Sequence, residues 1–306
     1  MARQIIWTGL KFAYTRAGRP ADEAGYPVRI VAGALSESVP SRDLLVTSEH
    51  SLFVNGGFVP VRMLVNGGSI AYDRDQSSFF YYHIETADHS VIFANGCATE
   101  SFLDTGHRNI FEGSDNVISL RAKTWADAAA PLMTAREAVE PVYAALAARS
   151  IDLGFEEQSV SQVTNEADLH LMTTEGVTVR ALRQSGECVS FMLPAGTRGV
   201  HLVSRASRPS DVIGPFVDDR RQLGVLVGAV HLATASGGQR EVISHLDSQL
   251  SGWNAPEGMH RWTTGCAFLA LPERATGISS ILTMEIVGAG PYLVTEDAED
   301  AQALFA

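Results

Sequence analysis

The chain has 306 residues, of which 45% are hydrophobic and 19% are charged. This composition is typical of a globular protein and excludes disorder over most of the length. The 35 acidic and 23 basic residues give a formal net charge of −12, without long runs of one sign. Nucleic acids and anionic membranes bind clustered lysine and arginine, so the charge argues against both as principal partners.

The sequence predicts neither a membrane span nor a secretory signal. No stretch approaches the ~20 continuous apolar residues that cross a bilayer, and the N-terminal apolar run is soon followed by Lys11 and Arg16. The compartment is therefore left open, as cytoplasm or as secretion by a route without a signal peptide. The cysteines predict no disulfide framework, metal site or cofactor, because they lie far apart, at Cys97, Cys188 and Cys266.

Residues 1–115 are predicted to form short strands separated by tight turns. Asn55-Gly56-Gly57 and Asn66-Gly67-Gly68 mark two of these turns, because Asn and Gly readily adopt the positive φ of a hairpin. Apolar and β-branched runs between the turns give these candidates: Gln4–Thr8, Val28–Val31, Leu44–Val46, Ser51–Val54, Phe58–Val61, Ser69–Tyr72, Phe79–Glu85 and Ser90–Ala94.

Residues 116–164 are rich in alanine, with apolar residues three and four positions apart. This spacing predicts two short helices, broken near Pro131 and again near Pro141. Thr134 is the expected N-cap of the second helix, with Glu137 completing a capping box. We interpret the segment as a helical connector.

Residues 165–306 return to a β pattern without the alternation of strand and helix that a parallel sheet needs. The pattern predicts a β-sandwich or jelly roll, so the expected fold class is mainly β in both halves. The strand candidates are Leu169–Thr173, Thr178–Leu182, Cys188–Leu193, Gly199–Ser204, Leu223–Leu232, Cys266–Leu271 and Ser280–Val287.

Two motifs in the first unit carry the functional information. One places Thr47 three residues before His50 in a strand-like run. The other spans residues 81–104, YYHIETADHSVIFANGCATESFLD, where a β-patterned run leads through His89 into apolar residues that end at Ala94-Asn95-Gly96. In this order the motifs resemble those of the Hint family, the self-processing domains of inteins and Hedgehog proteins. The run Cys97–Gly106 resembles a bacterial subgroup of that family.

The resemblance implies a horseshoe-like, pseudo-twofold β fold and an acyl shift, in which a Cys or Ser attacks the preceding carbonyl and a histidine protonates the scissile amide. His50 would be that proton donor and Thr47 its hydrogen-bonding partner. In an ungapped alignment, the family's aspartate falls on His83, and its second histidine lies one position from His89. The catalytic candidates are therefore Thr47, His50, His83 and His89. We weigh against this the reading that Thr47 and His50 are ordinary strand residues with local hydrogen bonds.

The chain also departs from the family pattern. The histidine and asparagine that complete splicing fall on Glu100 and Ser101, so no succinimide can form and complete splicing is excluded. No cysteine precedes Cys97, and we expect the opening segment of the domain, with its nucleophile, to be missing. The expectation is a Hint-like protein with at most a partial autoproteolytic activity, whose implied partner is an upstream polypeptide.

The C-terminal half resembles the β-rich accessory domain that follows bacterial Hint domains. It supplies the residue types that bind sugars, flat aromatic faces with carboxylates and guanidinium groups, which favours a second hypothesis of a carbohydrate-binding or surface interaction module. The alternative is a tryptophan-anchored core with an Arg–Asp network. The candidate ligand-binding residues are Trp253, Trp262, Asp218, Asp219, Glu257 and Arg261.

Overall fold

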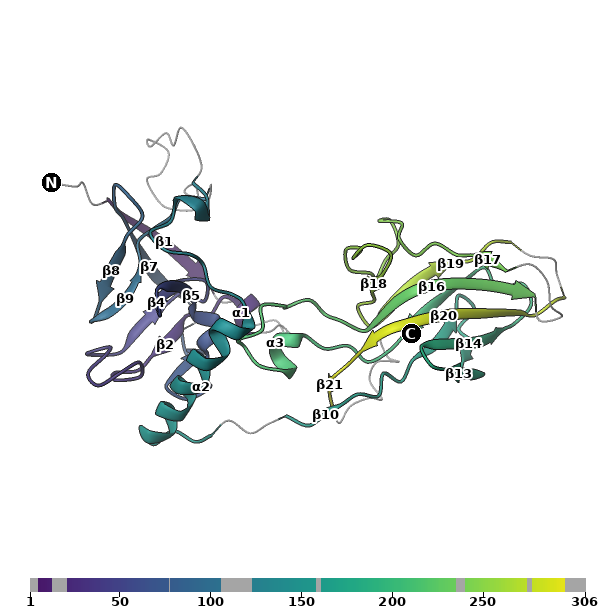
Figure 1. Cartoon of the computed structure of the whole chain (residues 1–306), viewed down its shortest axis with the longest axis horizontal. Coiled ribbons are helices and arrows are strands. Elements are labelled where there is room, and N and C mark those ends of the chain that lie inside the picture. The colour runs from purple at the N-terminus through teal and green to yellow at the C-terminus, as the bar shows by residue number, and fades with distance from the viewer. Residues whose placement is uncertain are drawn as a thin grey trace. The chain divides into compact units, whose positions relative to one another are not determined.

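The computed structural model describes residues 5–12, 21–76, 78–105, 123–157, 161–234, 240–273 and 277–294. The chain divides into two compact units: residues 1–159 with 215–218 form unit 1, and residues 160–214 with 219–306 form unit 2 (Figure 1). Both units are mainly β, as predicted, and their sheets are antiparallel. Among the described helices, none combines the length and apolar character that crossing a membrane requires.

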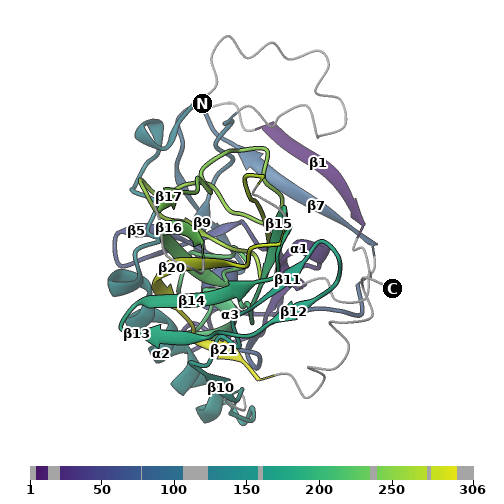
Figure 2. The same cartoon turned by 90° about the vertical axis from the view of Figure 1, so that its right-hand side faces the viewer.

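Unit 1 contains three small sheets. β1 (Ile5–Phe12) pairs with β7 (Ser78–Glu85) as a two-stranded ribbon (Figure 2). A second sheet has the order β3 (Leu44–Val46), β2 (Val28–Ile30) and β6 (Ile70–Tyr72). The third has the order β5 (Gly57–Pro60), β4 (Ser51–Val54), β9 (Cys97–Glu100) and β8 (Val91–Ala94).

Two Asn-Gly hairpin turns shape the third sheet. Asn55-Gly56 joins β4 to β5 and Asn95-Gly96 joins β8 to β9, with φ values of 51° and 85° and of 50° and 85°. Both residues of each turn have positive φ, as a type I′ hairpin requires. The second turn leads into β9, a strand that the sequence pattern did not predict. The Ala-Asn-Gly motif is therefore a hairpin turn whose exit strand runs past His50.

The helical prediction for residues 116–164 is partly wrong. One helix, α2 (Arg136–Asp152), runs through Pro141, and its N-cap is Ala135 without a side-chain bond, so Thr134 does not cap it. A proline inside a helix costs about 3 kcal/mol. Burial of Val139, Val142 and Leu146 offsets this cost, at about 1.5–3 kcal/mol for each side chain.

A capping box does occur earlier in this segment. Thr124 and Asp127 form it at the 3₁₀ turn η4 (Trp125–Asp127). The residues around Pro131 form no helix. Instead, the Pro131 carbonyl accepts a hydrogen bond from the Phe58 N–H at 2.8 Å, which attaches this segment to β5.

Helix α2 packs on unit 1 and shares its core. Its apolar side chains join those of the 3₁₀ turn η1 (Val61–Leu64) and of β2 in one buried cluster. Polar contacts fix the position: the Ser69 N–H donates to Ser150 Oγ at 2.9 Å, and Asn66 Nδ2 donates to the Leu146 carbonyl at 3.3 Å. Gly68 leaves room for this approach, because a Cβ there would lie 2.5 Å from Ser150 Oγ.

Unit 2 is a sandwich of two sheets that share one core. The smaller sheet has the order β12 (Thr178–Val179), β11 (His170–Thr173), β15 (Gly199–Val203) and β19 (Cys266–Ala270). The larger has the order β13 (Arg183–Ser185), β14 (Cys188–Leu193), β20 (Ser280–Ala289), β16 (Val225–Thr234) and β17 (Glu241–Val242), with β18 (Arg261–Trp262) also on β16.

Short elements complete the two units. In unit 1 a helical turn, α1 (Ala21–Ala24), precedes β2. In unit 2 the helix α3 (Pro209–Val212) follows β15, and β10 (Val163–Thr164) pairs with β21 (Tyr292–Leu293). The alternating residues of β14, β16 and β20 point into the shared core of unit 2, as their burial patterns show.

We predict that Ser150→Ala lowers the free energy of unfolding of unit 1 by about 1–3 kcal/mol, because it leaves the buried Ser69 N–H without its acceptor. Urea unfolding measures this loss. Ala144→Ser, on the exposed side of the same helix, is the matched control and should cost less than about 1 kcal/mol. Equal losses in the two variants would contradict the docking of α2 described above.

Candidate functional site

Three histidines of unit 1 belong to one cluster, in which His50 and His89 lie beside the carboxyl group of Glu100 and His83 lies beside His50. His50 precedes β4, His83 lies on β7 and His89 precedes β8. The ring centroids of His50 and His83 are 5.5 Å apart. Nδ1 of His50 lies 3.8 Å from Glu100 Oε1, and Nε2 of His89 lies 4.0 Å from Glu100 Oε2. Thr47 is half-buried one turn before His50, and its carbonyl accepts from the His50 N–H at 3.0 Å.

Strand β9 positions His50 through the backbone of Ser51. The hydroxyl of Thr99 contacts His50 Nε2 and donates to the Ser51 carbonyl at 2.8 Å. The next residue, Glu100, accepts the Ser51 N–H at 2.7 Å through Oε1. Both backbone polar groups of Ser51 are therefore bound by side chains of β9, which fixes the residue next to the histidine.

One ring nitrogen of His89 accepts a backbone hydrogen bond, and the other lies near Glu100. Its Nδ1 accepts the Ala129 N–H at 3.0 Å, and its ring packs against those of Phe58 and Trp125 at 5.1 Å and 6.1 Å between centroids. Its Nε2 is buried, lies 4.0 Å from Glu100 Oε2 and has no partner at good hydrogen-bond geometry among the described residues. The Ser101 backbone also interacts with the ring and raises its pKa, against the larger lowering by burial.

Burial decides the charge of these groups. Desolvation lowers the pKa of His50 to about 3, with a further contribution from His83, and lowers the pKa of His83 to about 4. Desolvation also raises the pKa of Glu100 to about 7. At neutral pH both imidazoles are uncharged, and the Glu100 carboxyl is close to its midpoint.

Cys97 does not supply a nucleophile in this structure. Its side chain is fully buried on β9, and desolvation raises the pKa of its thiol to about 11. Because the thiolate is the attacking form of cysteine, this group is unreactive at neutral pH. It behaves as a small core residue.

The sequence pattern missed Glu100 as a site residue. The aligned position placed it where the splicing histidine would be, and it was interpreted only as a loss of that group. The available signal was a carboxylate within a short β-hairpin strand, which has a buried, half-buried alternation. Across the described ranges, no three or more His, Cys, Asp or Glu side chains have an arrangement that could hold a metal ion.

Two of the candidate ligand-binding residues are structural. Trp253 is buried in the core of unit 2, and its indole N–H donates to the Phe268 carbonyl at 2.7 Å. Arg261 is 3% exposed, lies 5.7 Å from the Trp253 ring centre and donates to three backbone carbonyls, those of Asn254, His245 and Asp247. For this pair the structure shows the tryptophan-anchored core that was weighed against sugar binding.

The other four candidates each have their own surroundings. Asp218 belongs to unit 1, where it accepts an ion pair from Arg62 at 2.8 Å. Asp219 and Glu257 belong to unit 2 and both pair with Arg221 at 2.7 Å. Trp262 lines a cavity of about 40 Å³, far below the 300–1,000 Å³ typical of small-molecule sites.

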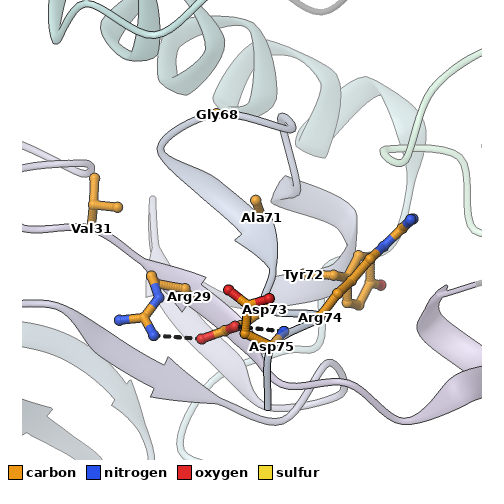
Figure 3. Close-up of a pocket in the computed structure, with 8 residues that line it drawn as sticks. All are labelled: Arg29, Val31, Gly68, Ala71, Tyr72, Asp73, Arg74 and Asp75. Carbon is orange, nitrogen blue, oxygen red and sulfur yellow. Dashed lines mark hydrogen bonds and ion pairs between the residues drawn. The ribbon is translucent and has the colours of Figure 1, made fainter. Parts of the chain in front are cut away.

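A larger cleft, of about 330 Å³, lies on the three-stranded sheet of unit 1 (Figure 3). Arg29 of β2 points at Asp73, with 2.5 Å between the charged atoms, and also pairs with Asp43 at 3.2 Å. Arg74 points away from this pair in Figure 3. The buried charge of the cleft is therefore compensated within the protein, and the cleft lies on a different sheet from Glu100.

We predict that Glu100→Gln stabilises unit 1 above neutral pH. The folded protein holds the Glu100 proton up to a pKa of about 7, against an ordinary value of 4.5. The stability that this raised pKa gives the folded state is therefore fully present below pH 4.5 and is lost as the pH rises towards 7. Glutamine does not titrate, so the variant avoids this loss of about 3 kcal/mol.

Urea unfolding of both proteins across this pH range tests the prediction. His50 and His83 act in the opposite direction, since their lowered pKa values make the folded state gain stability as the pH rises to 6.5. Comparison of the two proteins at each pH removes the part of this contribution that they share, and the contact between Glu100 and His50 leaves a coupling in the difference. A difference between variant and wild type that does not depend on pH would contradict the burial of Glu100.

We also predict that Trp253→Ala lowers the free energy of unfolding of unit 2 by about 3–5 kcal/mol, the usual cost of emptying a buried tryptophan site. Glu257→Gln removes only an ion pair with exposed partners and should cost less than about 1 kcal/mol. Thermal unfolding of the two variants distinguishes core from surface. A Trp253→Ala protein as stable as wild type would refute the structural role.

Comparison with known proteins agrees with the geometry of unit 1. Residues 1–106, which include all three histidines and Glu100, match the family described as Hint domain. No curated protein sequence and no solved structure matches the chain. The matched region contains the Thr47-x-x-His50 motif and the β8–β9 hairpin. The N-terminal part of this chain is a Hint domain, and the chain is a Hint-domain protein.

Proposed function

We propose that this Hint domain supports an acyl shift at a peptide bond, with His50 as the proton donor to the departing amide nitrogen. The observation that carries the proposal is the convergence of His50 and His83, 5.5 Å apart, with Thr47 adjacent, inside the region that matches the family. An amide nitrogen is a poor leaving group until it is protonated, so a placed N–H donor is what the reaction needs.

The environment of His50 suits this role. The ring is held by Thr99 on one side and by the neighbouring His83 on another, so its orientation is fixed before any substrate is present. Its lowered pKa keeps it uncharged at neutral pH. A neutral imidazole offers one N–H and one lone pair, and it can therefore donate and recover a proton through its two nitrogens.

The attacking nucleophile is the missing component of the proposal. Cys97 is buried, and no cysteine precedes it in the sequence. We therefore expect no self-cleavage by the family mechanism from these residues alone, and cleavage where a cysteine is supplied ahead of the domain. The alternative, a carbohydrate-binding module in unit 2, rests only on Trp262 and on the Arg221 ion pairs, and we do not propose it as the function.

The test supplies the nucleophile. A reporter protein is joined to Met1 through a linker with one cysteine, whose position is varied. The expected result is thiol-dependent release of the reporter from at least one fusion, followed by intact mass spectrometry. His50→Ala should slow release about 100-fold or more, the usual contribution of a general acid.

His170→Ala is the matched control, because this histidine lies on β11 in unit 2 and is outside the cluster. It should release the reporter at the rate of the unmodified fusion. Folded fusions that retain their full mass for every cysteine position would overturn the proposal. So would release from His50→Ala at the wild-type rate.

A further inference from the structure

His50 poses a problem for any proton donor role, because a buried neutral imidazole carries only one ring proton. The hydrogen-bond network decides which nitrogen holds it. Ser51 is opposite Pro60 in the β4–β5 ladder, and the adjacent bond from the Val61 N–H to the His50 carbonyl makes this a pair without hydrogen bonds of its own. The Ser51 carbonyl therefore points away from β5, and the Thr99 hydroxyl of β9 donates to it at 2.8 Å.

The single hydroxyl hydrogen of Thr99 is thereby used on the Ser51 carbonyl. In its second contact, with His50 Nε2, the same oxygen must act as the acceptor. The ring proton of His50 is therefore on Nε2, and Nδ1 presents a lone pair. That lone pair faces Glu100 Oε1 across 3.8 Å.

A lone pair and a carboxylate oxygen repel each other, and both side chains here are only 12% exposed. When the Glu100 carboxyl group carries a proton, an O–H donor faces the Nδ1 acceptor and this repulsion is removed. His89 differs from His50 in the ring atom that it presents to Glu100. Its Nδ1 accepts the Ala129 N–H, so its own proton is on Nε2, which lies 4.0 Å from Glu100 Oε2, and the ring also interacts with the Ser101 backbone. His89 therefore presents an N–H on the side of Glu100, whereas His50 presents a lone pair.

We propose that Glu100 holds the proton that His50 Nδ1 lacks, and that it acts through His50 as a positioning residue for proton transfer. This inference rests on the proposed acyl shift. In the step, the supplied cysteine has lost its thiol proton to solvent, and its thiolate forms the new S–C bond at the carbonyl carbon. As the C–N bond breaks, the Nε2–H of His50 leaves its Thr99 acceptor and passes its proton to the departing amide nitrogen. The Glu100 O–H bond breaks and Nδ1–H forms. Glu100 remains as a carboxylate and regains a proton from solvent.

The neighbouring groups leave Glu100 as the one suited to hold this proton near neutrality. Burial lowers the pKa of His50, His83 and His89, and raises those of Tyr81 and Cys97. Lys123 acts on His89 and lowers its pKa further. With a pKa of about 7, Glu100 exchanges its proton with solvent in the physiological range. The titratable neighbours are His50 and His89 beside Glu100, His83 beside His50, Tyr81 beside His83, and Lys123, which acts on His89.

Nuclear magnetic resonance of the full chain tests the pair without any cleavage. With ¹⁵N-labelled histidine, His50 should show the Nε2–H tautomer, and with ¹³C-labelled glutamate the Glu100 carboxyl should titrate near neutral pH. In Glu100→Gln that titration disappears, while the His50 tautomer stays. A Glu100 carboxyl that titrates near the ordinary value of about 4.3, or a His50 proton on Nδ1, overturns the inference.

The reporter fusions test how the proton is used. Every fusion needs the attacking thiolate, so the ratio of two release rates isolates the effect of the Glu100 proton. The rate of the unmodified fusion divided by that of Glu100→Gln should fall about tenfold per pH unit above the Glu100 pKa, and Glu100→Asp should recover this pH dependence in part. Glu137→Gln, on α2, is the control with an unchanged profile.

The two proposals fail separately. Release whose pH profile is the same in Glu100→Gln and the unmodified fusion overturns the role of Glu100 and leaves the acyl shift standing. Absence of release from every fusion, in a protein whose resonances show the expected proton pair, overturns the acyl shift and removes the role in catalysis with it.

Discussion

The site depends on how β9 binds the backbone of Ser51. The backbone groups of Ser51 point away from β5, where Thr99 donates to the carbonyl and Glu100 accepts the N–H. These two consecutive side chains of β9 satisfy the backbone of Ser51 and hold His50, the preceding residue, against both of them.

Burial then sets the chemistry of this arrangement. The desolvation that disfavours a charged imidazole also disfavours a charged carboxylate, so the pKa values of His50 and Glu100 move in opposite directions. The pair stays neutral overall while it retains one transferable proton. His83 and His89 enclose it from two further directions, and the aromatic rings of Phe58 and Trp125 pack on His89. The cluster functions as one unit, and single substitutions in it should not be additive.

Much of the fold could be predicted from the sequence, because turns and alternation are local signals. Asn55-Gly56 marked a hairpin correctly, and the predicted strand at Ser51–Val54 matches β4. β9 could not be predicted, since Cys-Ala-Thr-Glu has little β-propensity and its pairing depends on β4 and β8. The helix break at Pro141 was predicted wrongly, because the local cost of proline is outweighed by core packing that only the tertiary structure shows.

The candidate site was predicted in the same uneven way. Motif spacing found His50, and alignment found His83, which the fold brings to within 5.5 Å of each other. Glu100 required knowledge of which side chains meet across strands. The candidate sugar-binding residues of unit 2 were chosen from residue types alone. Only the packing shows that Trp253 and Arg261 donate hydrogen bonds to backbone carbonyls.

The central claim is that His50 is a buried, uncharged imidazole fixed beside the Glu100 carboxyl group. The most direct measurement is the pH titration of the His50 Cε1–H proton resonance in the full chain. The account predicts that this resonance stays at its neutral-imidazole position down to a pH of about 4, far below an ordinary histidine. A titration midpoint near 6.5, the ordinary pKa of histidine, would show that His50 is solvated and would contradict this claim.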